Sequence, residues 1–391
     1  MAIAFPPLDF DQYHTDRLPA LLAAGNGALA APDVRTVAPI AFRLPDGRAY
    51  TYVPCADSIE VVAGDAGAAT VVELDDAVWS DFVHELRTSF GLLYADLLRL
   101  PRGSFDGLVR WEPALRAMFD GQPIFDPSAV EGFDLQRSFT LESTDAVLRA
   151  FLDCTGFLHL RGVFTPSEVS ALVAETERLR ADARPNDGRS WWATDRDGHQ
   201  VCCRLIYMGL RSELVASLGD DARLRRLAGL SGVHLEPEID RLDGQSVVIK
   251  NPGVVEGLSD LPWHRDCGLG GHPVLCPSVA VGIQLDPANA ANGQLCMLAG
   301  SWRGSAHQLR PGDEDRMPVV VLDAEPGDVT VHYGHMLHAA PPPSAPDAGR
   351  RALYVTFTRP ETLEYVGPMR GYNDVLFVRD GAVRAPEEFV G

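Results

Sequence analysis

The chain has 391 residues, which is long enough for two domains or for one large domain with an extension. A composition of 46% hydrophobic and 23% charged residues is typical of a globular protein with a substantial core and excludes disorder on a large scale. The formal net charge of -20, with no basic run, argues against nucleic acid or an anionic membrane surface as the main partner.

The N-terminus lacks a charged segment followed by an apolar one, and no stretch reaches the roughly 18 apolar residues of a membrane span. We therefore expect a soluble, cytoplasmic protein. The 7 cysteines are odd in number and show no C-x-x-C spacing, so the sequence indicates neither a disulfide framework nor a structural zinc site.

Residues 1–140 are predicted to form a small N-terminal α+β region. Apolar alternation over 49–55 and 69–74 predicts strands, and the run 75–98 has apolar residues near helical spacing after a possible aspartate cap. The order strand, strand, helix is weakly similar to a sterol-carrier module, which would imply a lipid-like ligand.

Residues 141–391 are predicted to form a second domain. A helix is expected to begin at Thr165-Pro166-Ser167-Glu168, with proline and glutamate in its first turn. Short apolar strands then recur between Gly, Pro, Asn and Asp turns and predict a β-sandwich or barrel, namely SVVIK, SVAVGIQL, GQLCMLAG, MPVVVL, DVTVHY and ALYVTFTRP.

A candidate metal site lies in the segment LPWHRDCG. His264 and Asp266 are two positions apart, so on an extended strand both side chains point to one face. Their neighbour Cys267 is not expected to be a ligand, because Asp266 already supplies a hard donor.

A third ligand is expected from PGDVTVHYGHMLH, where three histidines stand at three-residue intervals. On strand parity His332 and His338 point one way and His335 the other, although Gly334 interrupts the strand. Two histidines and one carboxylate form a facial triad, which leaves three coordination positions open and suits non-haem Fe(II).

Two arginines, Arg350 and Arg351, open the last strong strand. The planar guanidinium of an arginine at the mouth of a barrel is suited to bind a carboxylate through two hydrogen bonds. A shift of one residue in register exchanges their faces, so either arginine is a candidate.

Together these motifs resemble the phytanoyl-CoA dioxygenase family of Fe(II)- and 2-oxoglutarate-dependent oxygenases, from about Asp153 to Thr358. The marks are GFLHLRGVFTPSEV, VVIKNPG, WHRD, LDPANAANGQLCMLAGS, PGDVTVHYGHMLH and RRALYVTF. The resemblance implies an α+β protein with a double-stranded β-helix core, also called a jelly roll or cupin-like fold, and flanking helices. It also implies that O2 is a co-substrate.

The resemblance assigns roles to individual residues. It implies that His264, Asp266 and His338 are the iron ligands, and that Arg350 binds the distal carboxylate of 2-oxoglutarate. Lys250 and Gln284 are placed near this co-substrate. The chain departs from the family at Ala299-Gly300-Ser301-Trp302, where Pro-Gly-Ser-His is frequent, and at Ala340, where a small hydroxyl residue is frequent.

The implied reaction is hydroxylation of an unactivated C–H bond in a small lipid-like or natural-product substrate, with release of succinate and CO2. Desaturation and cyclisation remain open, whereas halogenation would require a small residue at Asp266. The aromatic residues of segment 190–210 and Arg204 form either a pocket wall for an apolar substrate with an anionic group or a set of core aromatics with a surface arginine, and the sequence leaves both open. A divalent-metal hydrolase and a non-catalytic small-molecule binding protein are the alternatives.

Overall fold

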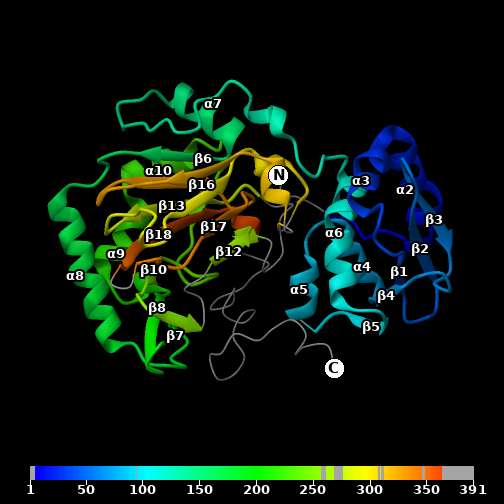
Figure 1. Ribbon diagram of the computed structural model, residues 1–391, viewed down its shortest axis with the longest axis horizontal. Coiled ribbons are helices and arrows are strands. Elements are labelled where there is room, and N and C mark those ends of the chain that lie inside the picture. The colour runs from blue at the N-terminus through cyan, green and yellow to red at the C-terminus, as the bar shows by residue number, and fades with distance from the viewer. Residues whose placement is uncertain are drawn as a thin grey trace.

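The computed structural model describes residues 5–94, 96–256, 261–267, 276–306, 309, 312–345 and 348–362. Two regions lie side by side: an N-terminal one, blue to cyan, and a larger one that contains most of the strands (Figure 1). Within the described residues, no helix is both long enough and apolar enough to cross a membrane.

The N-terminal region combines a helical segment with a five-stranded sheet of order β3-β2-β1-β4-β5. Its helices are α1 (Phe10–Gln12), α2 (Leu18–Leu21), α3 (Gly27–Val34), α4 (Asp76–Val83), α5 (Ser89–Tyr94) and α6 (Phe105–Asp120). Its strands are β1 (Ile40–Arg43), β2 (Ala49–Pro54), β3 (Ile59–Ala63), β4 (Thr70–Glu73) and β5 (Arg99–Arg102). The two strands expected from apolar alternation are thus confirmed as β2 and β4.

The single helix expected over 75–98 is wrong, because the segment forms two helices, α4 and α5. The first helix ends at Val83 with His84 as its C-cap, and Glu85 follows with a φ of 58°, a left-handed conformation that interrupts a helix. Leu86 and Leu93 are buried, as the apolar spacing indicates. The same spacing did not indicate that the helix is interrupted between them.

The larger region contains helices that flank two sheets. The helices are α7 (Asp145–Thr155), α8 (Pro166–Asp182), α9 (Glu213–Ser217) and α10 (Ala222–Gly229). Helix α8 begins where the sequence predicts, because the Thr165 hydroxyl accepts from the Glu168 backbone N–H while the Glu168 carboxylate accepts from the Thr165 backbone N–H.

One sheet of the larger region has the order β11-β7-β8-β10-β18-β13-β16-β6, with β9 paired to β18. Its strands are β6 (Phe157–Leu160), β7 (Ser190–Asp195), β8 (Gln200–Leu205), β9 (Glu236–Pro237), β10 (Ser246–Lys250), β11 (Val254–Glu256), β13 (Val279–Gln284), β16 (Val329–Tyr333) and β18 (Arg350–Thr358). The second sheet has the order β12-β17-β14-β15, with β12 (Leu261–His264), β14 (Leu295–Leu298), β15 (Val319–Leu322) and β17 (His338–Ala340). All six strands predicted from apolar runs are present.

The buried side chains divide into two main clusters. One contains residues from Phe10 to Ile124, and the other contains residues from Val130 to Phe357 drawn from both sheets of the larger region. Leu298 and Leu337 of the larger region belong to the N-terminal cluster, so the two regions share buried apolar surface. The fold is therefore a mixed α+β arrangement in which the N-terminal region packs against the strands of the larger one.

Candidate active site

The side chains of His264, Asp266 and His338 converge at the end of the β12-β17 pair. His264 on β12 lies opposite His338 on β17 in an antiparallel register, and Asp266 follows β12 by two residues. One ligand atom from each residue lies within 4.8 Å of the other two. The Nε2 atoms of His264 and His338 are each 3.6 Å from Oδ1 of Asp266.

Backbone hydrogen bonds orient both histidine rings. Nδ1 of His264 donates to the Pro262 carbonyl at 2.7 Å, and Nδ1 of His338 donates to the Met336 carbonyl at 2.9 Å. In each ring Nδ1 is thus occupied by a backbone carbonyl, and Nε2 is the atom turned toward Asp266. This is the arrangement by which metal-binding histidines are commonly fixed.

Electrostatics favours the metal-binding forms of these groups. Burial, together with the neighbouring imidazole of His264, lowers the pKa of His338 to about 3, so this ring is neutral at neutral pH. Burial acts to raise the pKa of Asp266, but the imidazoles of His338, His264 and His332 outweigh it and hold that pKa well below its usual value.

The other two histidines of the second motif separate as strand parity predicts. His332 on β16 faces the same site, with Nε2 3.5 Å from Oδ2 of Asp266 and its ring 4.4 Å from that of His338. His335 contacts Cys267 instead, with Nδ1 3.1 Å from Sγ. Three donors that fit one ion are thus His264, Asp266 and His338, and His332 lies directly beside them.

A set of buried polar side chains shares one face of the larger sheet. Lys250 lies opposite Arg350, and Gln284 lies opposite Ala352, so these side chains point to the same face. The exposed fractions of Lys250, Gln284 and Arg350 are 1%, 2% and 3%. The three predicted co-substrate residues are therefore brought together by strands β10, β13 and β18.

Specific contacts hold these residues. Arg350 donates from Nε and Nη2 to the Gly293 carbonyl at 3.0 and 2.8 Å, and Lys250 donates to the carbonyls of Ala340 and Pro341. Oε1 of Gln284 is buried and accepts no hydrogen bond within the described part of the chain. A buried amide oxygen of this kind is costly unless a ligand or water supplies a donor.

A further group of charged residues lies near the site, and of these Arg204 alone was given a role by the sequence. Arg204 forms an ion pair with Asp243 at 2.5 Å, and its guanidinium lies 4.7 Å from the ring centre of Trp191. Glu238 is buried, which raises its pKa to about 8, and it accepts a 2.6 Å hydrogen bond from Thr358. The expectation that Arg204 offers its charge to an anionic substrate does not fit this ion pair.

The N-terminal region supports the segments that carry the triad. Trp263, next to His264, and Leu337, next to His338, both pack against the N-terminal hydrophobic cluster. The Ser301 hydroxyl accepts a 2.9 Å hydrogen bond from the Leu337 backbone N–H. Packing on one side and this hydrogen bond on the other fix the backbone beside both histidines.

The arrangement fits a ferrous ion. Two imidazoles and a carboxylate on one side of a point are the donor set of non-haem Fe(II) oxygenases. The sequence profile of the phytanoyl-CoA dioxygenase (PhyH) family matches residues 152–352, about half of the chain. The chain belongs to this family, and with it to the Fe(II)- and 2-oxoglutarate-dependent oxygenases.

Several solved structures are similar to this family member. AviO1 from Streptomyces viridochromogenes Tue57 is 22% identical over 56% of this chain and 96% of its own, with a TM-score of 0.44. The carbocyclase SnoK from nogalamycin biosynthesis is 22% identical over 60% and 96%, with a TM-score of 0.46. EctD from S. alaskensis with bound Fe is 19% identical over 61% and 83%, with a TM-score of 0.46. No curated protein sequence matches the chain.

Proposed function

We propose that His264, Asp266 and His338 bind Fe(II) and that the chain oxidises a small organic substrate with 2-oxoglutarate and O2. The observation that carries the proposal is the convergence of these three donors within 4.8 Å, with both Nδ1 atoms already bonded to backbone carbonyls. When bound, the iron supplies the chemistry that activates oxygen, and the protein supplies position and exclusion of water.

Arg350 is proposed to bind the distal carboxylate of 2-oxoglutarate. Its guanidinium is almost fully buried, and the Gly293 carbonyl fixes its orientation. A buried, fixed guanidinium is well suited to bind a carboxylate through two charge-assisted hydrogen bonds. Lys250 is proposed to add a positive charge near the same carboxylate, and Gln284 is proposed to form a polar contact with the co-substrate.

Arg351 does not fit this role as well as Arg350. Its guanidinium donates to both carboxylate oxygens of Asp286 at 2.7 and 2.8 Å and to Glu177 at 2.8 Å. Its donors are therefore used on the side of the sheet away from Lys250. This difference supports Arg350 among the two candidates.

The core of the larger region is proposed to be a double-stranded β-helix. From β12 to β18, strands that follow one another along the chain alternate between the two sheets, except for β14 and β15, which are paired in the smaller sheet. Both sheets contribute to one hydrophobic cluster. Buried residues up to Ile124 belong to the N-terminal cluster, and those from Val130 onward belong mainly to the cluster of the larger region. This change supports separate N-terminal and oxygenase regions, with a boundary between these two residues, shortly before the expected position at residue 141.

The proposed reaction is hydroxylation of a C–H bond with formation of succinate and CO2. Glu238 and Asp243 both interact electrostatically with Asp266, and Arg204 is already paired with Asp243. With Glu238 protonated and Arg204 paired with Asp243, these three residues offer no unpaired cation to the phosphates of an acyl-CoA, so they favour an uncharged substrate. We therefore favour an uncharged natural product over an acyl-CoA.

Anaerobic titration of the Fe(II)-loaded protein with 2-oxoglutarate tests the proposal. Chelation of the keto acid produces a weak visible charge-transfer band, which we expect in the native chain and not in Asp266→Ala. A folded, iron-loaded protein without the band would refute the oxygenase assignment. Activity without oxygen or 2-oxoglutarate would instead favour a hydrolase, and binding of small molecules without turnover would favour a non-catalytic protein.

A further inference from the structure

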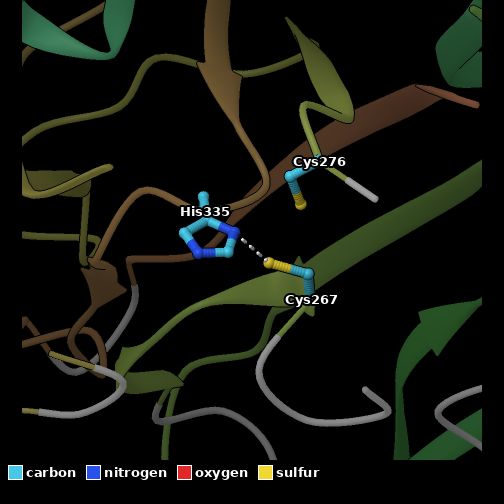
Figure 2. A group of neighbouring side chains, drawn as sticks. All are labelled: Cys267, Cys276 and His335. Atoms are coloured by element: carbon cyan, nitrogen blue, oxygen red, sulfur yellow. Dashed lines mark hydrogen bonds between the residues drawn. The ribbon is translucent and has the colours of Figure 1, made fainter. Parts of the chain in front are cut away.

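A second cluster of potential metal ligands begins at Cys267, the residue that directly follows Asp266. Sγ of Cys267, Sγ of Cys276 and a ring nitrogen of His335 all lie within 4.8 Å of one another. Figure 2 shows the three side chains directed toward a common point, with the hydrogen bond between Cys267 and His335 drawn. Neither cysteine forms a disulfide.

Three separate segments of the chain build this cluster. Cys267 directly follows the triad residue Asp266, and Cys276 lies shortly before β13. His335 lies in the turn between β16 and β17, where it points away from His332 and His338 and toward the cysteines. The two strands thus direct His332 and His338 toward the triad, and the turn between them directs His335 toward this second point.

The spacing fits a single small cation. Zinc binds cysteine sulfur at about 2.3 Å and histidine nitrogen at about 2.0–2.1 Å in a tetrahedron, so two donors of one ion stand about 3.6–3.8 Å apart. The three donors lie within 4.8 Å of one another, and Cys267 Sγ is 3.1 Å from His335 Nδ1. Modest shifts of these side chains, on the order of 1 Å or less, would place all three around one ion.

The chemistry of the donors separates this cluster from the triad. Two thiols and an imidazole form a soft donor set, which selects zinc over Mg²⁺, whereas the carboxylate-containing triad suits Fe(II).

We propose that Cys267, Cys276 and His335 bind a zinc ion, with water in the fourth position. Binding replaces the two thiol protons, which are released to solvent, and involves no oxidation or reduction. The ion would join the segment after Asp266, the segment before β13 and the turn before His338. The zinc would thus be a positioning element for the iron ligands, not a reacting group.

Thiol protection in the native full-length chain gives the first test. The chain is stripped with a chelator, kept reduced, and labelled with N-ethylmaleimide in the presence or absence of Zn²⁺. Peptide mass spectrometry is expected to show that zinc slows labelling of Cys267 and Cys276 at least tenfold. Labelling of the partly buried Cys154, outside the cluster, is expected to be unchanged.

Cobalt substitution gives a second test that separates the two sites. Thiolate-bound Co²⁺ produces an intense near-ultraviolet charge-transfer band, which carboxylate and imidazole ligands do not. We expect the band in the native chain and in Asp266→Ala, and its loss in Cys276→Ser and His335→Ala, with Cys154→Ser as the matched control. Circular dichroism checks that each variant is folded.

The proposal does not depend on the iron assignment, because none of the three residues belongs to the triad. Loss of the 2-oxoglutarate band with retention of the cobalt–thiolate band would refute only the oxygenase assignment. Equal labelling of Cys267 and Cys276 with and without zinc would overturn the zinc site even if a variant failed to fold. Recovery of a Cys267–Cys276 disulfide from protein purified without oxygen would overturn it as well.

Discussion

Arg350 and Arg351 are consecutive residues on β18 whose guanidinium groups are held on opposite faces of the sheet. Arg350 is 3% exposed and donates to the Gly293 carbonyl. Arg351 is paired with Asp286 and Glu177. The two residues have the same chemistry and adjacent positions, so each serves as a control for the other.

We expect Arg350→Gln to weaken 2-oxoglutarate binding far more than Arg351→Gln. Loss of a buried charge that pairs with a carboxylate costs about 2 kcal/mol or more, which corresponds to roughly a 30-fold increase in Kd. Arg351→Gln removes a partly exposed ion pair and is expected to change Kd less than about threefold. Anaerobic titration of the two variants measures this. Equal effects would show that Arg350 is not the anchor.

Two of the three histidines that face Asp266, His338 and His332, are expected to differ in the same titration. His338→Gln removes one of the three convergent donors, so we expect loss of Fe(II) binding and of the charge-transfer band. His332 lies beside the other carboxylate oxygen of Asp266 and is not one of the three donors, so His332→Gln is expected to retain the band with a shifted maximum. If the band survives in His338→Gln and disappears in His332→Gln, then His332 and not His338 is the iron ligand.

Local patterns predicted the elements around the site well. The strands β10, β13, β16 and β18 were found because apolar residues between turn signals identify buried strands, and α8 because Thr165 and Glu168 form a capping box. The separation of His335 from His332 and His338 agrees with strand parity, although a turn at Gly334 and His335, rather than a continuous strand, produces it. These features depend on neighbours along the chain, which a sequence displays directly.

Contacts between distant segments could not be predicted in this way. Cysteine spacing gave no sign that Cys267 and Cys276 meet His335, because the turn between β16 and β17 brings the histidine to them. The choice between Arg350 and Arg351 required the partners Gly293 and Asp286, which lie far away in the sequence. The break between α4 and α5 depends on the backbone conformation of one residue, Glu85, which no propensity indicates.

The carbonyl that orients Arg350 belongs to a glycine that has no room for a side chain. Gly293 has a φ of +71°, and a Cβ built there would lie 1.9 Å from the Pro341 carbonyl oxygen. Lys250 donates a hydrogen bond to the Pro341 carbonyl, and Arg350 donates to the Gly293 carbonyl. A shift of Pro341 away from Gly293 would therefore disturb both Lys250 and Arg350 in the proposed co-substrate pocket. Gly293→Ala is therefore expected to lower stability and to weaken 2-oxoglutarate binding.

Gly132→Ala is the matched control for this prediction. Gly132 has a φ of +81° with nothing within 4 Å of a Cβ, so the substitution costs only the left-handed backbone penalty of about 1–2 kcal/mol. We expect Gly293→Ala to lower the free energy of unfolding by more than this, and only Gly293→Ala to raise the Kd for 2-oxoglutarate. Indistinguishable results for the two variants in urea unfolding and in the titration would exclude a role for the Gly293–Pro341 contact.

A buried histidine in the N-terminal region is expected to make the stability of the protein depend on pH. Burial lowers the pKa of His14 to about 4, and its ring nitrogens contact the Phe10 carbonyl and the Tyr52 hydroxyl. In the unfolded chain the pKa is about 6.5, so between these two values the unfolded state binds the proton more tightly. Stability is therefore full above about pH 6.5 and is lost as the pH falls toward 4.

The loss attributable to His14 is about 2–3 kcal/mol between pH 7 and pH 4.5, at about 1.4 kcal/mol per pH unit. Urea unfolding of the native chain and of His14→Gln at both pH values measures it. The variant is expected to be less stable at pH 7, because it loses the buried contacts, yet to lose 2–3 kcal/mol less on acidification. His199→Gln, at an exposed histidine, reports the general effect of removing such a side chain. Parallel losses in the native chain and His14→Gln would show that His14 takes up its proton in the folded state as readily as in the unfolded one.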